Sequence, residues 1–462
     1  MKSMRVLLDK RFIFLPVLLA LVGAGCPAKP IVADTGRLLH YPTQIAAPEA
    51  TLDEGFRLPA PGTQASSPPE VTAATSQGIS SGLCPPLPGP GGVTVNVSNE
   101  ADLRNWAYNA AAGTTILIQP GVYHMGGYVH IINNSITLRG GTSNRDAVVL
   151  DFGGMVGGHF GILVDGDDVT IANLTIRNAK DHGVSIQGAD RPVLYNLHIL
   201  DIGDQLVKVN PAGDGSEDGV LACSRLEYTT SAPDNYTNGI SAHNAHRWVV
   251  RDNTWRRIRT PTNDPVPTIL FWSGSADTVV ERNLLVDCYQ GIAFGNASHE
   301  AGDHSGGVVR NNFIYASMPH DVVIEMVHAS GWLVANNTAL LLDPAPGLTW
   351  GMEARYADSA GTFAYNLTNL DIWVDRDGAD GASVGNVTEA ASDWFVHAAS
   401  GDLHLLATAT AAIDQAVALP QVSDDFDGQL RPEGEAPDVG GDEYLAPRSW
   451  IYLPLLLCPP MR

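Results

Sequence analysis

Residues 280–296 read VERNLLVDCYQGIAFGN, and they hold the pattern that decides the fold: an apolar run, an asparagine, a second apolar run, a polar turn and a third short run. An asparagine recurs in this setting along the chain, at Asn173, Asn196, Asn253, Asn283, Asn312, Asn337, Asn366 and Asn386. The spacing is 20 to 30 residues throughout if Cys223 takes the asparagine position in the one longer interval. The sequence therefore contains an internal repeat of 20 to 30 residues.

Each repeat carries three short apolar segments that cannot enclose a core of their own. Stacked coil on coil, they bury one continuous interior, which is the pattern of a parallel β-helix. Asparagines at the same bend of successive coils then lie above one another, so their amides hydrogen-bond to each other and to turn backbone. Asparagine also tolerates the left-handed conformation of a tight bend. We therefore expect the asparagines to be structural.

The opening strand AGTTILIQPGVY at 112–123 and the coils from 169 to about 390 resemble the right-handed parallel β-helix, or pectin-lyase-like, proteins. DDFDGQLRPEGEAPDVGGDEY at 424–444 resembles the closing segment of bacterial surface β-helix proteins. The resemblance implies an all-β fold, a right-handed parallel β-helix with end caps over 93–445. The helical spacing in SNEADLRNWAYNAAAG predicts an N-terminal capping helix that begins at Ser98 or Asn99. The resemblance to β-helix proteins leaves the activity open, because the same coil occurs in lyases, hydrolases and non-enzymatic proteins.

The chain ends carry their own signals. Basic residues followed by FIFLPVLLALVGAG at 12–25 predict an export signal over 1–26. LVGAGC resembles a bacterial lipobox, so we expect lipidation at Cys26 and anchoring at the cell envelope or cell surface, with a simple cleaved secretory signal as the alternative. Residues 27–92 are rich in Pro, Ser and Ala, which predicts a tether, and 446–462 form an apolar tail too short to span a bilayer.

Composition limits the partners. A formal net charge of -23 disfavours nucleic acid, since no basic run offsets it. Cysteine spacing matches no zinc pattern. Cys223 and Cys288 are interpreted as small buried residues, and no disulfide pairing can be deduced.

The third strand of each coil carries the substrate groove in the family that the chain resembles. Strand alternation sends one parity inward, at Val184, Ile186, Val207, Val209, Ile240, Ala242, Ile269, Phe271, Ile292, Phe294, Val322, Ile324, Met352 and Ala354. The opposite parity then faces solvent. One outer column is Ser185, Lys208, Ser241, Leu270, Ala293, Val323 and Glu353, and its neighbour is Gln187, Asn210, His243, Trp272, Gly295, Glu325 and Arg355.

A candidate site follows from these columns. Coils stack about 4.8 Å apart, so Lys208, Asn210, His243 and Trp272 are predicted to lie within roughly 10 Å of one another. A cation, an imidazole, an amide and an indole suit a sugar polymer. A solvated polar face, with the indole packed under a loop, is the alternative.

Further candidates surround this group. Glu325 and Arg355 extend the predicted binding face, and two long loops at 226–238 and 257–267 supply Tyr236, Arg257 and Arg259.

A calcium site is a further possibility. Asp181, Asp201 and Asp204 precede neighbouring strands, and lyases of the family use such an ion to neutralise a uronate carboxylate. An ordinary acidic turn is the alternative interpretation.

Two functions follow. The first is lyase-like β-elimination of an acidic polysaccharide, with Lys208 as the base, His243 as alternative base or acid, and Arg257 or Arg259 binding carboxylate. The sequence lacks the Arg-x-Pro-x-x-Arg pattern of classical pectate lyases and the motifs of polygalacturonases. The second is a non-catalytic surface protein that binds glycan or another surface partner.

Overall fold

The computed structural model describes residues 83–299, 301–342 and 350–446. The predicted export signal, most of the predicted tether and nearly all of the apolar tail lie outside the described residues. Within them, no helix is both long and apolar enough to cross a bilayer.

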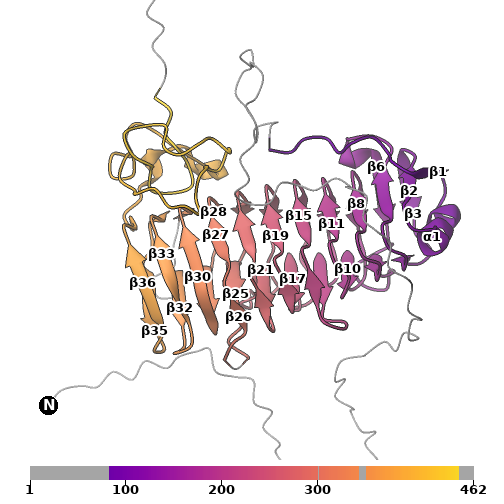
Figure 1. Cartoon of the computed structure of the whole chain (residues 1–462), viewed down its shortest axis with the longest axis horizontal. Helices are drawn as coiled ribbons and strands as arrows, with labels where there is room; N and C mark the ends of the chain where they lie inside the picture. Colours follow the sequence, from indigo (N-terminus) through magenta and orange to yellow (C-terminus); the bar gives the residue numbers. More distant parts are fainter. Residues whose placement is uncertain (1–82, 300, 343–349, 447–462) are drawn as a thin grey trace, which may run out of the picture. The chain divides into compact units, whose positions relative to one another are not determined.

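Three parallel sheets form the walls of the β-helix, and the chain visits them in turn (Figure 1). Sheet A contains β1 (Val93–Val97), β2 (Thr114–Ile118), β5 (Thr137–Gly140), β8 (Thr170–Ala172), β11 (Val193–Tyr195), β15 (Val220–Ala222), β19 (Val249–Arg251), β23 (Val279–Glu281), β27 (Val308–Arg310), β30 (Ala329–Ala335), β33 (Ala360–Ala364) and β36 (Asp380–Val384). Four two-residue strands widen it: β14 (Ser216–Glu217), β18 (Ala245–His246), β22 (Ser275–Ala276) and β26 (His304–Ser305).

Sheet B contains β3 (Gly121–His124), β6 (Val148–Asp151), β9 (Thr175–Arg177), β12 (His198–Leu200), β16 (Arg225–Glu227), β20 (Thr254–Arg256), β24 (Leu284–Val286), β28 (Phe313–Ala316), β31 (Thr338–Leu341) and β34 (Leu367–Thr368). Sheet C contains β4 (Val129–Ile131), β7 (Ile162–Val164), β10 (Val184–Gln187), β13 (Val207–Asn210), β17 (Ile240–His243), β21 (Pro267–Trp272), β25 (Gln290–Phe294), β29 (Val322–Val327), β32 (Trp350–Arg355) and β35 (Ile372–Arg376). The predicted parallel β-helix is therefore confirmed.

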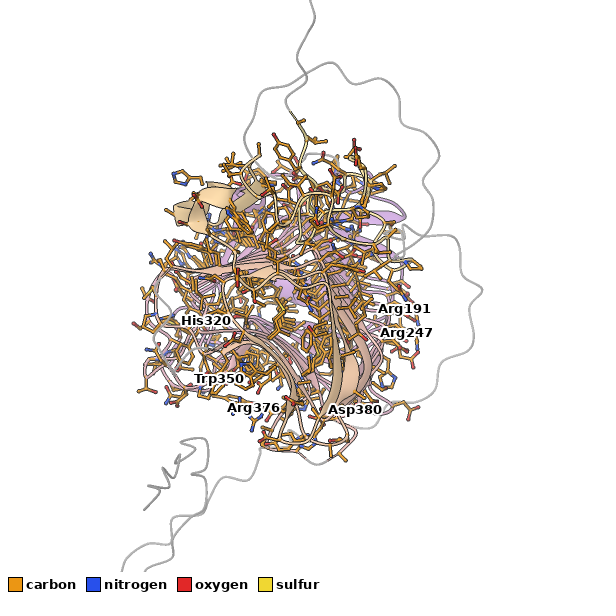
Figure 2. All side chains as sticks on the ribbon, turned by 90° about the vertical axis from the view of Figure 1, so that its left-hand side faces the viewer. Arg191, Arg247, His320, Trp350, Arg376 and Asp380 are labelled. Atoms are coloured by element: carbon orange, nitrogen blue, oxygen red, sulfur yellow. A yellow bond between two sulfur atoms is a disulfide. The ribbon has the colours of Figure 1, made fainter. Side chains whose placement is uncertain are left out.

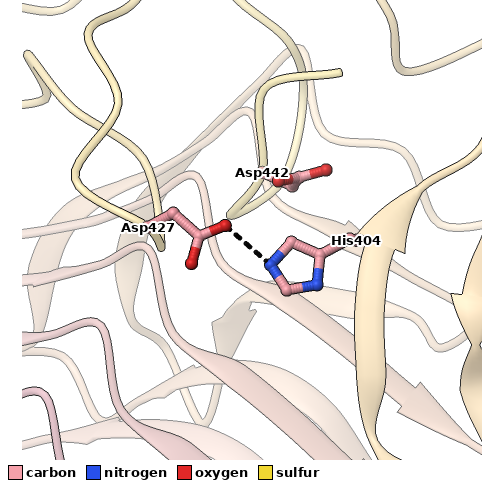
Figure 3. A group of neighbouring side chains, drawn as sticks. All are labelled: His404, Asp427 and Asp442. Carbon is pink, nitrogen blue, oxygen red and sulfur yellow. Dashed lines mark hydrogen bonds and ion pairs between the residues drawn. The ribbon is translucent and has the colours of Figure 1, made fainter. Parts of the chain in front are cut away.

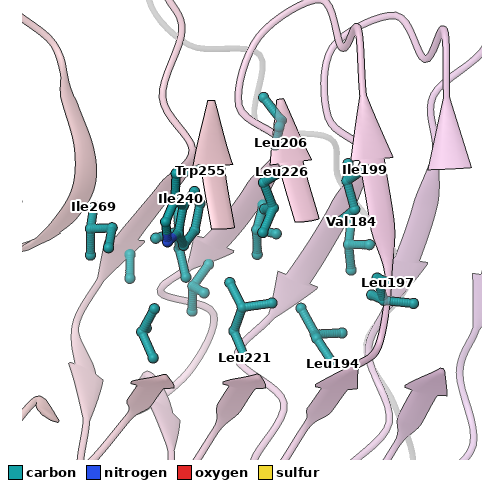
Figure 4. Packing of buried hydrophobic residues seen from close by; sticks show 14 of the residues in the cluster. Val184, Leu194, Leu197, Ile199, Leu206, Leu221, Leu226, Ile240, Trp255 and Ile269 are labelled. Atoms are coloured by element: carbon teal, nitrogen blue, oxygen red, sulfur yellow. The ribbon is translucent and has the colours of Figure 1, made fainter. Parts of the chain in front are cut away.

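The interior is a continuous apolar core, because one parity of every sheet C strand points inward (Figure 4). All fourteen residues predicted to face inward are 0% exposed. Sheets A and B add residues such as Leu194 and Leu226 to the same cluster. Burial of this apolar surface is the main stabilising contribution to the stack.

A helix, α1 (Glu100–Asn109), forms where the spacing predicts one. Asn99 is its N-cap, and the Asn99 side chain accepts a hydrogen bond from the backbone N–H of Asp102. Leu103 and Ala107 are buried against the first coils, whereas Trp106 is 38% exposed.

The predicted asparagine ladder is present from Asn253 onward, but the residues assigned to it in the earlier coils lie one position too early in the strand register. Asn253 and Asn283 are fully buried, and each amide group bonds the asparagine of the next coil. Strand pairing places Asn196 and Cys223 one residue earlier, level with Asp252 and Arg282 at the left-handed bend. In the ladder proper, the bend conformation therefore belongs to the residue before the asparagine. The buried position is taken first by Leu197 and Ser224, and asparagine occupies it from Asn253 onward.

Cys223 is not simply a packed thiol, since it forms a disulfide with Cys84. The segment 83–92, predicted as the last part of the tether, lies along the outside of the helix at this corner. The Tyr195 hydroxyl donates to the carbonyl of Pro85, and Arg139 donates to that of Pro88. Cys288 is buried, as predicted, and its thiol is free.

After β36 the chain leaves the coil and forms a closing segment that packs on the helix, drawn in yellow in Figure 1. It holds the short 3-10 helices Ser392–Trp394 and Ala398–Ser400 and the antiparallel pair β37 (Phe395–His397) and β38 (Asp402–Leu405). Another 3-10 helix, Arg145–Ala147, lies earlier in the chain, directly before β6. Arg431 is buried in it, donating to Glu443 and to the carbonyl of Gly440.

Candidate functional site

Lys208 is the centre of the candidate site, and it is buried rather than exposed as predicted. Its side chain projects from the outer face of β13 but is only 4% exposed. The Nζ atom lies 2.7 Å from His243 Nε2 and donates to the Ser241 hydroxyl at 3.2 Å. Burial lowers the pKa of Lys208 to about 8, although the carboxylate of Asp204 opposes this shift. A substantial share of the amine is therefore neutral near physiological pH.

His243 holds this amine by accepting its hydrogen bond. Burial, together with the neighbouring charge of Lys208, lowers the pKa of His243 to about 3. The imidazole is therefore neutral, and its Nε2 lone pair faces Lys208. A neutral ring in this place orients the amine without adding charge.

Two aromatic rings, those of Trp272 and Tyr236, lie beside Lys208 and His243, where the sequence predicted them. The ring of Trp272 lies edge-on to His243 with centroids 4.4 Å apart, and its indole N–H donates to Ser241. Tyr236, 55% exposed, comes from the loop before β17 and brings its ring centroid within 5.9 Å of Lys208 Nζ. Asn210, also predicted here, donates to Ser185 on the neighbouring strand. The predicted group of cation, imidazole, amide and indole is thus brought together.

His299 also belongs to this group, and the sequence analysis missed it. Its ring lies 4.4 Å from that of Trp272, tilted by 33°, and Asp303 accepts from its Nδ1. The residue stands in the loop after β25, outside the strand columns. A search of the loops that follow the third strand of each coil would have found it.

Glu325 lies in a different column from the predicted one. Strand pairing places it level with Ala293 and Glu353, in the column of Lys208, which is a shift of two residues for β29. A shift of two residues keeps every side chain on the same face of the strand. The inward-facing residues of β29 were therefore predicted correctly, whereas the residues predicted to lie beside Glu325 were wrong. Glu325 is 7% exposed and accepts a hydrogen bond from Gln290.

The predicted arginines do not converge on Lys208. Arg259 donates to the carbonyls of Asp287 and Pro319 and so stabilises its own loop. Arg355 is 5% exposed and pairs with Asp377. Arg257 is exposed at the end of β20 and lines a hollow on sheet B. None of the three contacts the Lys208 group: Arg259 and Arg355 are held by other partners, and Arg257 lines the hollow on sheet B.

The predicted calcium ligands also separate. Asp201 accepts hydrogen bonds from the backbone N–H groups of Thr229 and Thr230, so its carboxylate stabilises a turn. Asp204 stays near the site, where burial and the charges of Asp234 and Asp181 raise its pKa to about 7. The predicted set does not meet around one point in the described residues.

Among the residues that the structure describes, one group of possible metal ligands does meet, in the closing segment: His404, Asp427 and Asp442 (Figure 3). The two ring nitrogens of His404 already contact carboxylates, Asp402 at 2.6 Å and Asp427 at 3.0 Å. Burial opposes protonation, but these hydrogen bonds and nearby charges raise the pKa of His404 to about 10. The group is therefore an ion-pair cluster that joins β38 to later residues of the closing segment.

Residues 88–339 match the family described as "Right handed beta helix region". The chain belongs to this family. The right-handed coil predicted from the sequence is thereby established for this β-helix protein. A comparison with curated proteins finds no significant match.

Solved structures with similar coils include two lyases and a tailspike protein. An alginate lyase from Paenibacillus sp. str. FPU-7 is 17% identical, with 56% of this chain and 97% of that chain covered and a TM-score of 0.39. Pectate lyase Pel9A is 14% identical, with 73% and 90% covered and a TM-score of 0.49. The Dettilon tailspike protein is 12% identical, with 63% and 60% covered and a TM-score of 0.39. Identities this low carry no information about the reaction.

Proposed function

We propose that this β-helix protein is exported to the cell surface and cleaves an acidic polysaccharide by β-elimination. The contact of a buried Lys208 with a neutral His243 beside Trp272 carries the proposal. An amine with a pKa of about 8 suits a general base near neutral pH. Tyr236 is exposed and offers an aromatic face to sugar rings, and the half-buried Trp272 offers the part of its ring that His243 and His299 leave uncovered.

In this reaction Lys208 Nζ takes the proton from the carbon beside the uronate carboxylate. The electron pair of that C–H bond forms a carbon–carbon double bond, and the bond from the neighbouring carbon to the glycosidic oxygen breaks. The leaving oxygen then takes a proton from the solvent or from the site. His243 keeps the amine oriented throughout and remains neutral.

The reaction needs a cation that neutralises the substrate carboxylate. Calcium was predicted for this role, but Asp181, Asp201 and Asp204 do not fit one ion as they stand, so no step is routed through it. A calcium requirement stays a prediction, which loss of activity on adding a chelator would support.

The test uses a panel of acidic polysaccharides and the ultraviolet absorbance of the unsaturated product. Lys208→Met keeps the buried stem and removes the base, so we expect product formation to fall by roughly 100-fold or more. Lys180→Met is the matched control, since Lys180 is exposed, pairs with Asp181 and acts on the site only through its charge near Asp204. If Lys208→Met forms product at the rate of the control, Lys208 is not the base.

A second function is favoured by the low exposure of Lys208 and by the engagement of Arg259 and Arg355 elsewhere. These features suit a glycan-binding surface protein without catalysis. Trp272→Ala should then abolish binding while no polysaccharide in the panel yields product. In the lyase, the same variant should weaken substrate binding more than turnover, since stacking holds ground state and transition state alike.

Export and lipidation at Cys26 are part of the proposal, and the Cys84 to Cys223 disulfide supports an oxidising compartment. Metabolic labelling with a fatty acid tests the anchor. Labelling that is lost in Cys26→Ala supports it, whereas equal labelling of both forms or none in either leaves simple secretion.

A further inference from the structure

We propose that a hollow on the outer face of sheet B binds an oxyanion, in the form of the carboxylate of one acidic sugar residue. The hollow has a volume of about 270 Å³ and is lined by Arg225, Arg256 and Arg257, with Glu227, Val286 and Asp287 among its other walls. It is separate from the Lys208 group on sheet C and does not depend on the proposed lyase activity.

Strand stacking builds this site. Arg225 stands on β16, and Arg256 ends β20, level with Glu227 on one neighbouring strand and Val286 on the other. Arg257 follows directly at a left-handed bend with φ of 53°. Three guanidinium groups from two adjacent coils are thus presented to one hollow.

The carboxylates of the hollow are already engaged. Glu227 is 5% exposed and accepts from Arg225 at 2.7 Å and from His198 at 2.9 Å. Burial opposes its ionisation, but these two contacts lower the pKa of Glu227 to about 2. Asp287 accepts from the backbone N–H and the hydroxyl of Ser317.

Arg256 and Arg257 are the two arginines of the hollow that are left to bind a ligand. Among the residues that the structure describes, neither Arg256 nor Arg257 forms an ion pair, although the chain carries a net charge of -23. Guanidinium groups that form no ion pair, at a concave place in so acidic a chain, point to an anionic ligand.

The chemistry of the ligand follows from the guanidinium groups and the volume. A guanidinium fork binds carboxylate, sulfate or phosphate oxygens through paired hydrogen bonds. The hollow is smaller than typical ligand pockets of roughly 300 to 1,000 Å³, so it suits one sugar acid or a small inorganic oxyanion rather than a length of polymer.

The test measures binding of a galacturonate trimer, its neutral methyl ester and inorganic sulfate by calorimetry at low salt. Trp272→Ala with Lys208→Met serves as the background, so that the sheet C site contributes neither binding nor cleavage. In that background, Arg256→Gln with Arg257→Gln should weaken galacturonate binding roughly tenfold or more, as expected for lost charge-assisted hydrogen bonds. The ester should bind weakly with or without these two changes.

Arg191→Gln with Arg247→Gln is the control, because it removes the same charge from a distant corner. Figure 2 shows Arg191 and Arg247 on one side of the β-helix and His320 on the opposite side. His320 marks the side of the loop after β20, because Arg259 of that loop donates to the carbonyl of Pro319, the residue before His320. Sulfate binding that depends on Arg256 and Arg257 supports the oxyanion site and identifies an inorganic ligand if galacturonate fails. Equal loss in both arginine pairs, or no loss in either, overturns the proposal.

Discussion

Asn283→Ala is the sharpest test of what holds the coils together. The Asn283 side chain is fully buried, and its Oδ1 accepts from the backbone N–H of Asn253 and from the indole N–H of Trp255, each at 3.3 Å. Its Nδ2 donates to the carbonyl of Val250 and to Asn312 Oδ1. Alanine would remove all of these contacts at once.

The magnitude follows from the groups left without a partner. The substitution strands two buried donors, those of Asn253 and Trp255, at about 1 to 3 kcal/mol each, so the expected loss is about 2 to 6 kcal/mol. The carbonyl of Val250 and the Asn312 amide oxygen add to the cost only where no other donor reaches them.

Denaturant unfolding followed by circular dichroism measures the effect as a lower midpoint. Asn105→Ala is the matched control, since Asn105 lies exposed on α1 and alanine suits a helix, so we expect a change within about 0.5 kcal/mol. If Asn283→Ala unfolds at the wild-type midpoint, the ladder does not stabilise the coil and the reasoning is wrong.

Two further predictions concern pH. The Asp204 carboxylate raises the pKa of Lys208 against the effect of burial. Asp204→Asn should therefore move the midpoint of the pH–activity profile to lower pH. A midpoint that stays or rises would contradict an interaction between Asp204 and Lys208. The pKa of His404 is raised above its ordinary 6.5 to about 10, so its stabilisation is complete below pH 6.5 and is lost as the pH rises towards 10. The difference in unfolding free energy between wild type and His404→Gln should therefore shrink over that range, and a constant difference would count against the ion-pair cluster.

The sequence by itself determined the coil and its interior. Repeated asparagines and strand alternation are local patterns, and fourteen inward residues were predicted without error because the alternation of a strand has a strict period of two. The same patterns indicated the N-cap at Asn99 and brought Lys208, His243 and Trp272 onto one face.

Only the tertiary structure decided how that face is covered and paired. The level at which β29 stacks, and hence the column of Glu325, depends on a loop length that the strand period does not encode. The ladder position of Cys223 and its disulfide to Cys84, 139 residues away, depend on a segment that returns along the outside of the helix. Lys208 is buried because residues from other coils and loops lie over it, and Arg257 faces another hollow because the bend after β20 turns it there. These outcomes are set by contacts between distant segments, whose free energies no local pattern records.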